Sequence, residues 1–210
     1  MRLALFEDHI QAAQKLHWAE APRSLFVVSG RLSVHVAGGP PTMLEPQDCQ
    51  LFTQALELQG EAEVWTFELS AQSAEALNHD EQARCILAHD IDLDPNEPVV
   101  LRADRVEFPA GMETPKHGHK AGGIRRLYRG RLIAEIGHEV RRIDARDAWF
   151  ETGHDPVVGR NIAPSSAFVR TMVLPASLLG HPTFIPWSDE EAAKPRGTQR
   201  TQYFDTLVTL

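Results

Sequence analysis

The sequence predicts an all-β protein made of two similar β-barrels joined by a short helical segment. Three observations lead to this prediction. Most of the chain consists of short apolar or alternating runs separated by turn residues, three sequence blocks recur about 100 residues apart, and one segment between the repeats has a helical pattern. With 210 residues, 42% of them hydrophobic, the chain is long enough for one large domain or two small ones.

An internal repeat is the strongest of these observations. Its core is the tripeptide Gly-Arg-Leu, which occurs at residues 30–32 and again at 130–132. Two further blocks follow in the same order. The three pairs are VVSGRLS (27–33) with LYRGRLI (127–133), DCQLFT (48–53) with DAWFET (147–152), and AEVWTFEL (62–69) with AFVRTMVL (167–174). Three collinear matches predict that the two halves fold alike.

The elements follow in order within each half. Runs such as RLSVHVAGG and EVWTFELS in the first half, and RLIAEIG and AFVRTMVL in the second, are typical of strands in a sandwich or barrel built from hairpins. Between the halves, residues 71–87 place apolar side chains at helical spacing after an acidic start, which predicts an amphipathic helix. The run YFDTLVTL at the end predicts a terminal strand, either added to one of the sheets or used for a dimer contact.

These elements predict four regions. Residues 1–72 form a first barrel, 73–97 a helical linker, 98–180 a second barrel and 181–210 a C-terminal extension. No run of about 18 apolar residues is present and the first residues lack the apolar core of a signal peptide, so the expected location is the cytoplasm. A formal net charge of −8 argues against nucleic-acid binding. Cys49 and Cys85 are not in a metal-binding or disulfide pattern.

The segment TPKHGHKAGG carries the clearest functional signal. His117 and His119 are separated by one residue, so on an extended chain both imidazoles project from the same face and can approach one point. Imidazole is a common ligand of transition metals, but a metal centre usually needs three or four protein donors. The rest of the chain must therefore supply at least one more.

These residues resemble the first conserved motif of the cupin superfamily, which has the form G, five residues, HxH, three or four residues, E, six residues, G. Gly111, His117, His119 and Gly130 occupy their positions with the correct spacing, but Gly123 stands where the family has glutamate. The resemblance implies tandem double-stranded β-helix, or jelly-roll, barrels, and therefore a bicupin. It also places His117 and His119 on a strand that faces the barrel interior.

The second cupin motif is less complete. It would run from Arg146 to Asn161, which matches the final asparagine of the family, whereas Val157 stands at the position of the third histidine ligand. In the first repeat only His17 remains of the four family ligands. The resemblance therefore implies a site in the second barrel, with a metal held by His117, His119 and a displaced third ligand, for which His154 is the candidate.

Four other residues are candidates for the site. Glu113 and His154 could transfer protons or complete the metal ligands. Trp149 and Asn161 are expected to contact a substrate. Arg125 lies two residues after Gly123, so alternation directs its guanidinium inward, where it needs an anionic partner: Glu113, Glu135, another protein carboxylate or an anionic substrate.

Two functions are compatible with the sequence. The resemblance implies a cupin enzyme of the dioxygenase or isomerase type, which would use one divalent transition metal (Fe, Mn, Ni or Zn) to act on a small, anionic organic molecule. The alternative is a non-catalytic module that binds a small molecule and has lost its metal. Cupin-like chains commonly pair, so a homodimer is expected.

Overall fold

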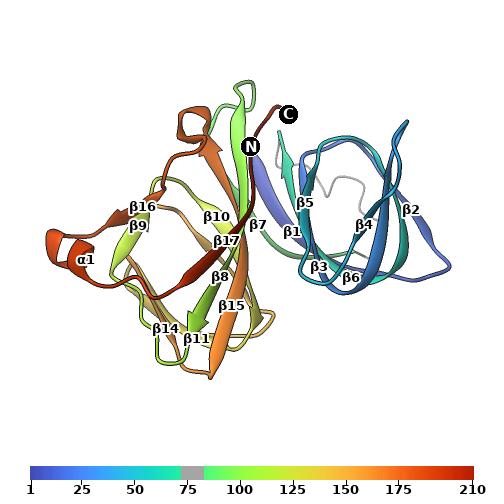
Figure 1. Cartoon of the computed structure of the whole chain (residues 1–210). Helices are drawn as coiled ribbons and strands as arrows, with labels where there is room; N and C mark the ends of the chain where they lie inside the picture. Colours follow the sequence, from blue (N-terminus) through green and yellow to red (C-terminus); the bar gives the residue numbers. More distant parts are fainter. Residues whose placement is uncertain (72–82) are drawn as a thin grey trace. The chain divides into compact units, whose positions relative to one another are not determined.

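The computed structural model describes residues 1–71 and 83–210. By their internal contacts the described residues form two compact units. The N-terminal unit comprises residues 1–98 and 208–210, and the C-terminal unit comprises residues 99–207. Each unit is built almost wholly of antiparallel strands (Figure 1), which confirms the all-β prediction. No helix among the described residues is long and apolar enough to cross a membrane.

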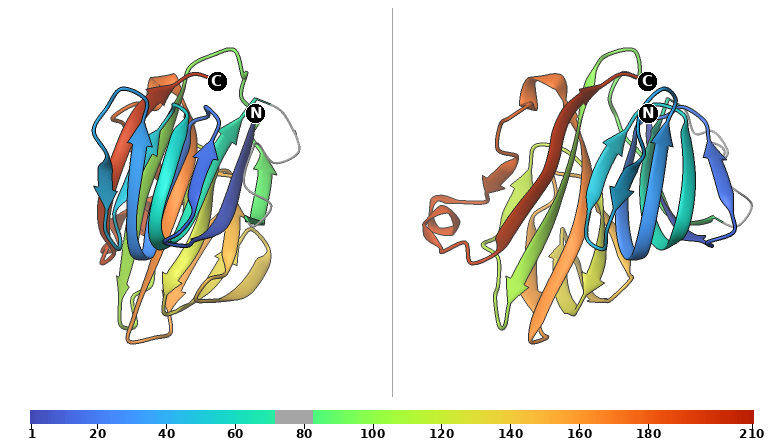
Figure 2. Two further views of the ribbon diagram at one scale, coloured as in Figure 1. Left: turned by 90° about the vertical axis from the view of Figure 1, so that its right-hand side faces the viewer. Right: turned by 45° about the vertical axis from the view of Figure 1, so that its right-hand side comes forward.

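The N-terminal unit is a seven-stranded sheet with the order β4-β3-β6-β1-β7, in which β2 pairs with β6 and β5 pairs with β3. Its strands are β1 (Arg2–Ile10), β2 (Lys15–Trp18), β3 (Arg23–Val36), β4 (Thr42–Leu44), β5 (Cys49–Phe52), β6 (Leu56–Ser70) and β7 (Arg84–Asp90). The long strands β3 and β6 pair along their whole length and curve around an apolar interior (Figure 2). Leu25, Val27, Leu32 and Phe52 belong to this core.

The C-terminal unit has two five-stranded sheets, with the orders β13-β10-β15-β8-β17 and β12-β11-β14-β9-β16. Its strands are β8 (Val99–Pro109), β9 (His117–His119), β10 (Gly123–Arg129), β11 (Arg131–Ile136), β12 (Glu139–Asp144), β13 (Ala148–Glu151), β14 (Val157–Asn161), β15 (Ser165–Pro175), β16 (Phe184–Pro186) and β17 (Gln199–Val208). Two short helices, η1 (Ala176–Leu178) and α1 (Asp189–Ala193), lie between the last strands.

The internal repeat is visible in the backbone of both units. Gly30 and Gly130 share a positive φ, +79° and +85°, at the same point of the repeat. At both glycines a Cβ atom would collide with a backbone carbonyl of the neighbouring strand. Gln47 and Arg146, 99 residues apart, also share a positive φ (75° and 79°) although neither is a glycine. The two halves therefore fold through the same local conformations.

The predicted helix over residues 71–87 is wrong for its last part. Residues 84–87 belong to β7, which pairs antiparallel with β1. This pairing satisfies the backbone groups along the β1 edge, and tertiary pairing of this kind overrides a helical pattern in the local sequence. Residues 72–82, which carry the rest of that prediction, lie outside the described residues.

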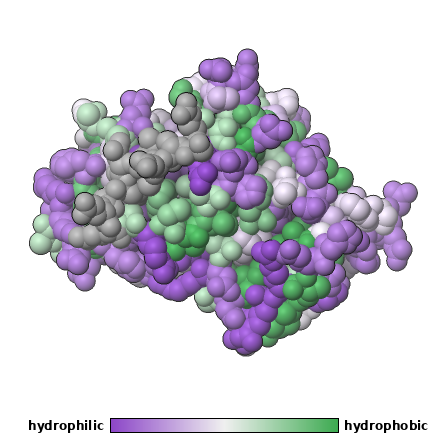
Figure 3. Space-filling view, turned by 180° about the vertical axis from the view of Figure 1, so that it is seen from behind, coloured by the Kyte–Doolittle hydropathy of each residue, from purple (hydrophilic) through white to green (hydrophobic). Residues whose placement is uncertain are grey.

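The C-terminal extension contributes two strands to the C-terminal unit. β16 pairs with β9, and β17 adds to the sheet next to β8. Of the two roles expected for the terminal run, the structure shows the added strand. On the face opposite to that of Figure 1, hydrophilic side chains cover most of the surface and hydrophobic residues gather in a few areas (Figure 3).

Candidate functional site

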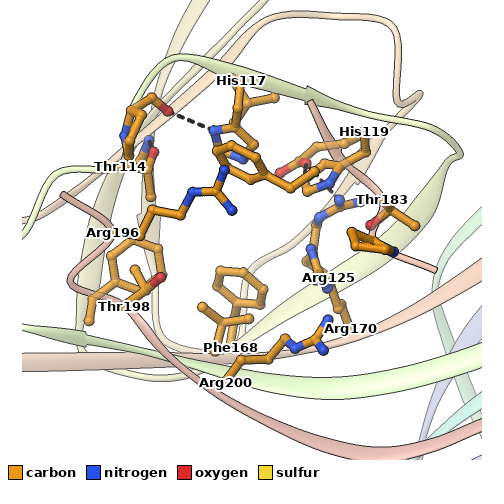
Figure 4. A pocket seen from close by; sticks show the side chains of 18 of the residues that line it. Thr114, His117, His119, Arg125, Phe168, Arg170, Thr183, Arg196, Thr198 and Arg200 are labelled. Atoms are coloured by element: carbon orange, nitrogen blue, oxygen red, sulfur yellow. Dashed lines mark hydrogen bonds and ion pairs between the residues drawn. The ribbon is translucent and has the colours of Figure 1, made fainter. Parts of the chain in front are cut away.

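The C-terminal unit contains a cavity of about 440 Å³ between its two sheets. One apolar part of its lining consists of side chains from four strands, namely Val106, Phe108, Leu132, Ala134, Trp149 and Phe168. The lining is also rich in arginine (Figure 4). A mostly apolar cavity of this size with a few convergent polar groups is typical of a small-molecule site.

His117 and His119 both line this cavity and are buried, with 7% and 5% of their surface exposed. They lie on β9, and their ring centroids are 5.0 Å apart. Nδ1 of His117 lies 2.7 Å from the carbonyl oxygen of Pro115 (Figure 4). Because a carbonyl only accepts hydrogen bonds, Nδ1 carries the proton and Nε2 is the unprotonated ring nitrogen of a neutral His117.

Both histidines are neutral at pH 7. Burial lowers the pKa of His117, although the bond to Pro115 and the charge of Glu151 act in the opposite direction. Burial, followed by the positive charges of Arg170 and Arg125, holds the pKa of His119 well below its usual value. Nδ1 of His119 is buried and has no hydrogen-bond partner among the described residues. The pair therefore offers neutral, polar ring atoms to the cavity.

Arg125 is fully buried and projects inward from β10, as alternation along the strand predicts. Its Nη2 lies 2.6 Å from Oε2 of Glu151 on β13, and its Nη1 donates to the carbonyl oxygen of Gly123. Burial lowers the pKa of Arg125 to about 10, which still leaves it charged at neutral pH. Its partner is therefore Glu151, whereas Glu113 and Glu135 both pair with Arg160.

Four further arginines that line the cavity were missed by sequence reasoning, and two of them, Arg170 and Arg102, lie on the long strands β15 and β8. Arg170 on β15 donates to both oxygens of the buried Asp104, at 2.7 and 3.1 Å. Burial opposes the charge of Arg170, but Asp104 outweighs it and the pKa of Arg170 is raised. Arg102 is held in the same bidentate way by Asp205 of β17, at 2.9 and 3.0 Å. For Arg102 and Arg170, the available signal was an arginine inside a mostly apolar run, VVLRA and AFVRTMVL respectively.

The residues at the site do not fit the predicted metal centre. No group of three or more His, Cys, Asp or Glu side chains within residues 1–71 and 83–210 is arranged to hold a metal ion. Glu151 lies 3.5 Å from His119, but it is already bound to Arg125 and to Nε1 of Trp149. Val157, which pairs with His117, presents an apolar side chain at the family's third histidine position.

The position of the family glutamate is closed as well. A Cβ atom on Gly123 would lie 2.5 Å from the carbonyl oxygen of Thr171 on the neighbouring strand, so a longer side chain does not fit there. His117 has the tautomer that a metal-bound histidine usually has. It is nevertheless surrounded by a guanidinium, a valine and a glycine where further ligands are needed.

The structure separates the other predicted residues into two groups. Trp149 lines the cavity and packs edge-on against Phe168, and its contact with a substrate stays a prediction. His154, Glu113 and Asn161 do not line it. His154 is exposed in the turn after β13, and Glu113 forms a surface ion pair with Arg160. The structure therefore does not bring His154 or Glu113 to the histidine pair.

Asn161 forms hydrogen bonds within the barrel and does not line the cavity. It is buried at the end of β14, where its amide nitrogen donates to the carbonyl oxygens of Phe108 and Pro109. Its side-chain oxygen accepts hydrogen bonds from the backbone of Ala163 and from the hydroxyl of Ser166. With these bonds Asn161 ties together the turns at one end of the barrel.

The fold of this chain is similar to that of several solved structures. No protein-family model and no curated protein matches the chain. Among solved structures, AerE from Microcystis aeruginosa is 15% identical, with 82% of this chain and 86% of that chain covered and a TM-score of 0.57. Salicylate 1,2-dioxygenase from Pseudaminobacter salicylatoxidans is 12% identical, covers 81% and 70%, and has a TM-score of 0.54.

A cupin 2 conserved barrel domain protein from Leptotrichia buccalis is also similar, with 10% identity, coverage of 81% and 82%, and a TM-score of 0.52. At these identities the likeness concerns the fold. The chain therefore has the fold of the cupin superfamily, as its histidine motif implied, with two barrels in tandem.

Proposed function

We propose that the C-terminal barrel binds a small organic carboxylate and does so without a resident metal ion. The observation that carries this proposal is the charge of the cavity. Five arginines line it, and among the residues that the structure describes only three carboxylates, Asp104, Glu151 and Asp205, lie within ion-pair distance of them. With both histidines neutral, two positive charges remain in excess, which favours an anionic ligand.

The shape and chemistry of the cavity support a ligand with an apolar body. Trp149 and Phe168 offer ring faces and edges to a flat or compact hydrocarbon part. Nδ1 of His119 and Nε of Arg125 are buried without a hydrogen-bond partner among the described residues, and a polar ligand group would satisfy such atoms. A salicylate 1,2-dioxygenase of this fold was solved as an adduct with gentisate, an aromatic carboxylate, at 11% identity and a TM-score of 0.56.

An isomerase that works by proton transfer is a second candidate, and His117 favours it. Its neutral ring has one nitrogen fixed as a donor to Pro115 and the other free to accept a proton from a bound acid. The dioxygenase prediction has no comparable support, because the residues for its metal are not assembled. The homodimer stays a prediction.

Calorimetric titration tests the proposal. Benzoate, salicylate, gentisate and succinate are the probes, and benzamide and salicylamide are matched uncharged controls. We expect at least one carboxylate to bind and its amide to bind more weakly. Failure of every carboxylate at millimolar concentration would overturn the proposal.

Elemental mass spectrometry of the native protein, beside a His117→Ala, His119→Ala variant, tests the metal-independent part. We expect the same trace metal content in both proteins, before and after reconstitution with iron, manganese, nickel and zinc. About one equivalent of metal in the native protein that the variant loses would restore the metalloenzyme prediction.

A further inference from the structure

The segment that follows β15 forms one wall of the cavity. It crosses from one sheet of the C-terminal unit to the other, because β16 pairs with β9 and β17 lies next to β8. Arg196, Thr198, Arg200 and Gln202 of this segment line the cavity. Arg196 and Arg200 are also exposed, so they lie where the cavity opens to solvent.

This crossing segment is fastened beside the histidine pair. The backbone N–H of Trp187 donates to the carbonyl oxygen of Lys116, and the N–H of Lys116 donates to Oε2 of Glu191 at 2.7 Å. Farther on, Gly197 packs so closely on Met112 that a Cβ atom there would collide with the sulfur. These contacts hold the backbone of the segment close to His117.

Arg196 differs from the deeper arginines in having no carboxylate partner. Its guanidinium lies 3.8 Å from the ring centroid of Phe184, and that ring stacks on His117 at 4.5 Å and 14°. No ion pair or hydrogen bond of Arg196 is found in the described part of the chain. Figure 4 shows its guanidinium reaching into the cavity, with Arg125 and Arg170 on the other side.

The positive charge of Arg200 is only partly compensated by a carboxylate. Its nearest carboxylate oxygen is Oδ2 of Asp104, 3.9 Å away, and Asp104 is already bound bidentately by Arg170. By contrast, Arg102, Arg125 and Arg170 each have a carboxylate within 3 Å. The two excess positive charges of the cavity are therefore those of the crossing segment.

From this arrangement we infer that Arg196, together with Arg200, binds the carboxylate of the ligand, while the apolar part of the ligand lies against Trp149 and Phe168. The inference rests on the proposed function and adds the orientation of the ligand. It makes the C-terminal segment a determinant of specificity: the charged end of the ligand is at the opening and its body is inside. A planar guanidinium with free N–H groups suits a carboxylate, which it can bind through two parallel hydrogen bonds.

The test is a cycle that combines protein and ligand changes. The tightest carboxylate of the calorimetric panel and its amide are titrated against the native protein and against Arg196→Gln, Arg200→Gln and Arg141→Gln. Arg141 is the matched control, because it is an exposed arginine of the same unit, pairs with Glu139 and does not line the cavity. All variants are first checked for an unchanged thermal midpoint.

We expect Arg196→Gln to weaken carboxylate binding by about tenfold or more, a loss typical of one charge-assisted hydrogen bond, and Arg200→Gln to weaken it less. The amide should bind the native protein and Arg196→Gln about equally, and Arg141→Gln should behave as native. Equal carboxylate affinity of the native protein and Arg196→Gln would overturn the inference and leave the proposed function standing. Failure of all carboxylates to bind the native protein would contradict both the inference and the proposed function.

Discussion

The interiors of the two barrels differ although their strands have the same register. In the N-terminal unit, Leu25 of β3 lies opposite Thr66 of β6, and Phe52 lies opposite Arg23. One repeat later, Arg125 lies opposite Arg170, and Glu151 lies opposite Gly123. The apolar pair Leu25 and Phe52 thus corresponds to the ion pair of Arg125 and Glu151. The N-terminal interior is a packed apolar core beside a buried ion pair, Arg23 with Glu68, whereas the C-terminal interior holds a cavity with several charged groups in its lining.

The strands that carry the histidine motif differ in the same way. In β2, Trp18 is buried in the apolar core, Leu16 packs against it and His17 is largely exposed beside Glu57. In β9, both His117 and His119 are buried. His17, which the motif alignment places at the position of His117, therefore points away from the interior. Burial of charged groups is expensive, and their concentration around the cavity supports the binding role proposed for the C-terminal barrel.

The ion pair of the C-terminal interior gives the largest expected effect. Arg125→Leu leaves Glu151 buried without its main partner, and we expect it to destabilise the C-terminal unit by about 3–5 kcal/mol. The double variant Arg125→Leu, Glu151→Phe copies the N-terminal pair and should recover most of this loss, because a buried ion pair can be replaced by packed apolar groups. Hydrogen exchange of peptides from β10 and β13 in urea reports this unit separately.

The control for this comparison is the reverse change in the other barrel. Leu25→Arg places an unpaired charge in an apolar core and should destabilise the N-terminal unit strongly, with exchange in β3 rising and exchange in β10 unchanged. If the double variant in the C-terminal unit were as unstable as Arg125→Leu alone, the two interiors would not be interchangeable, and the parallel between them would be wrong.

The shared glycines give the next largest effect and test what the two barrels have in common. Gly30→Ala and Gly130→Ala each place a side chain at positive φ and against a carbonyl oxygen, so each should cost about 2 kcal/mol or more in its own unit. Gly38→Ala and Gly111→Ala are the matched controls, since their φ values are also positive but no atom lies within 4 Å of the added Cβ. They should cost about 1 kcal/mol. Unequal losses at Gly30 and Gly130 would contradict the structural repeat.

Much of the fold and part of the site could be predicted from the sequence. The repeat around Gly30 and Gly130 predicted two barrels, and alternation along the strand predicted that Arg125 points inward. The i, i+2 spacing predicted that both histidines share one face. The sequence left the partner of Arg125 open, and it is a carboxylate that was not named there, Glu151. Glu151 shares a face with Trp149 in the same run, which was the available signal. The role of Arg196 depends on the pairing of β16 and β17 with distant strands, which no local pattern encodes.

A smaller effect is expected from pH, and it should separate the two units. Buried His117 and His119 have lowered pKa values. As the pH falls through the ordinary histidine pKa, these two residues therefore take up protons in the unfolded chain but not in the folded chain. The free energy of unfolding of the C-terminal unit should therefore fall as pH is lowered from 7 through the ordinary histidine range, until the folded histidines also protonate. Each unit of pKa depression is worth about 1.4 kcal/mol. His119→Asn should flatten this dependence in β10 and β13 peptides, and a slope that it leaves unchanged would assign the effect to other groups.

The smallest expected effect concerns two residues that the sequence favoured for chemistry. Glu113 and His154 are exposed, and neither lines the cavity. Since exposed ion pairs often contribute nothing measurable, Glu113→Gln and His154→Gln should leave both the thermal midpoint and carboxylate affinity unchanged. Calorimetric titration measures the affinity, and Arg196→Gln, measured in parallel, shows how large a real loss of carboxylate affinity is. A fall in affinity in either Gln variant would mean that its loop takes part in ligand binding, and the site would then extend beyond the residues that line the cavity.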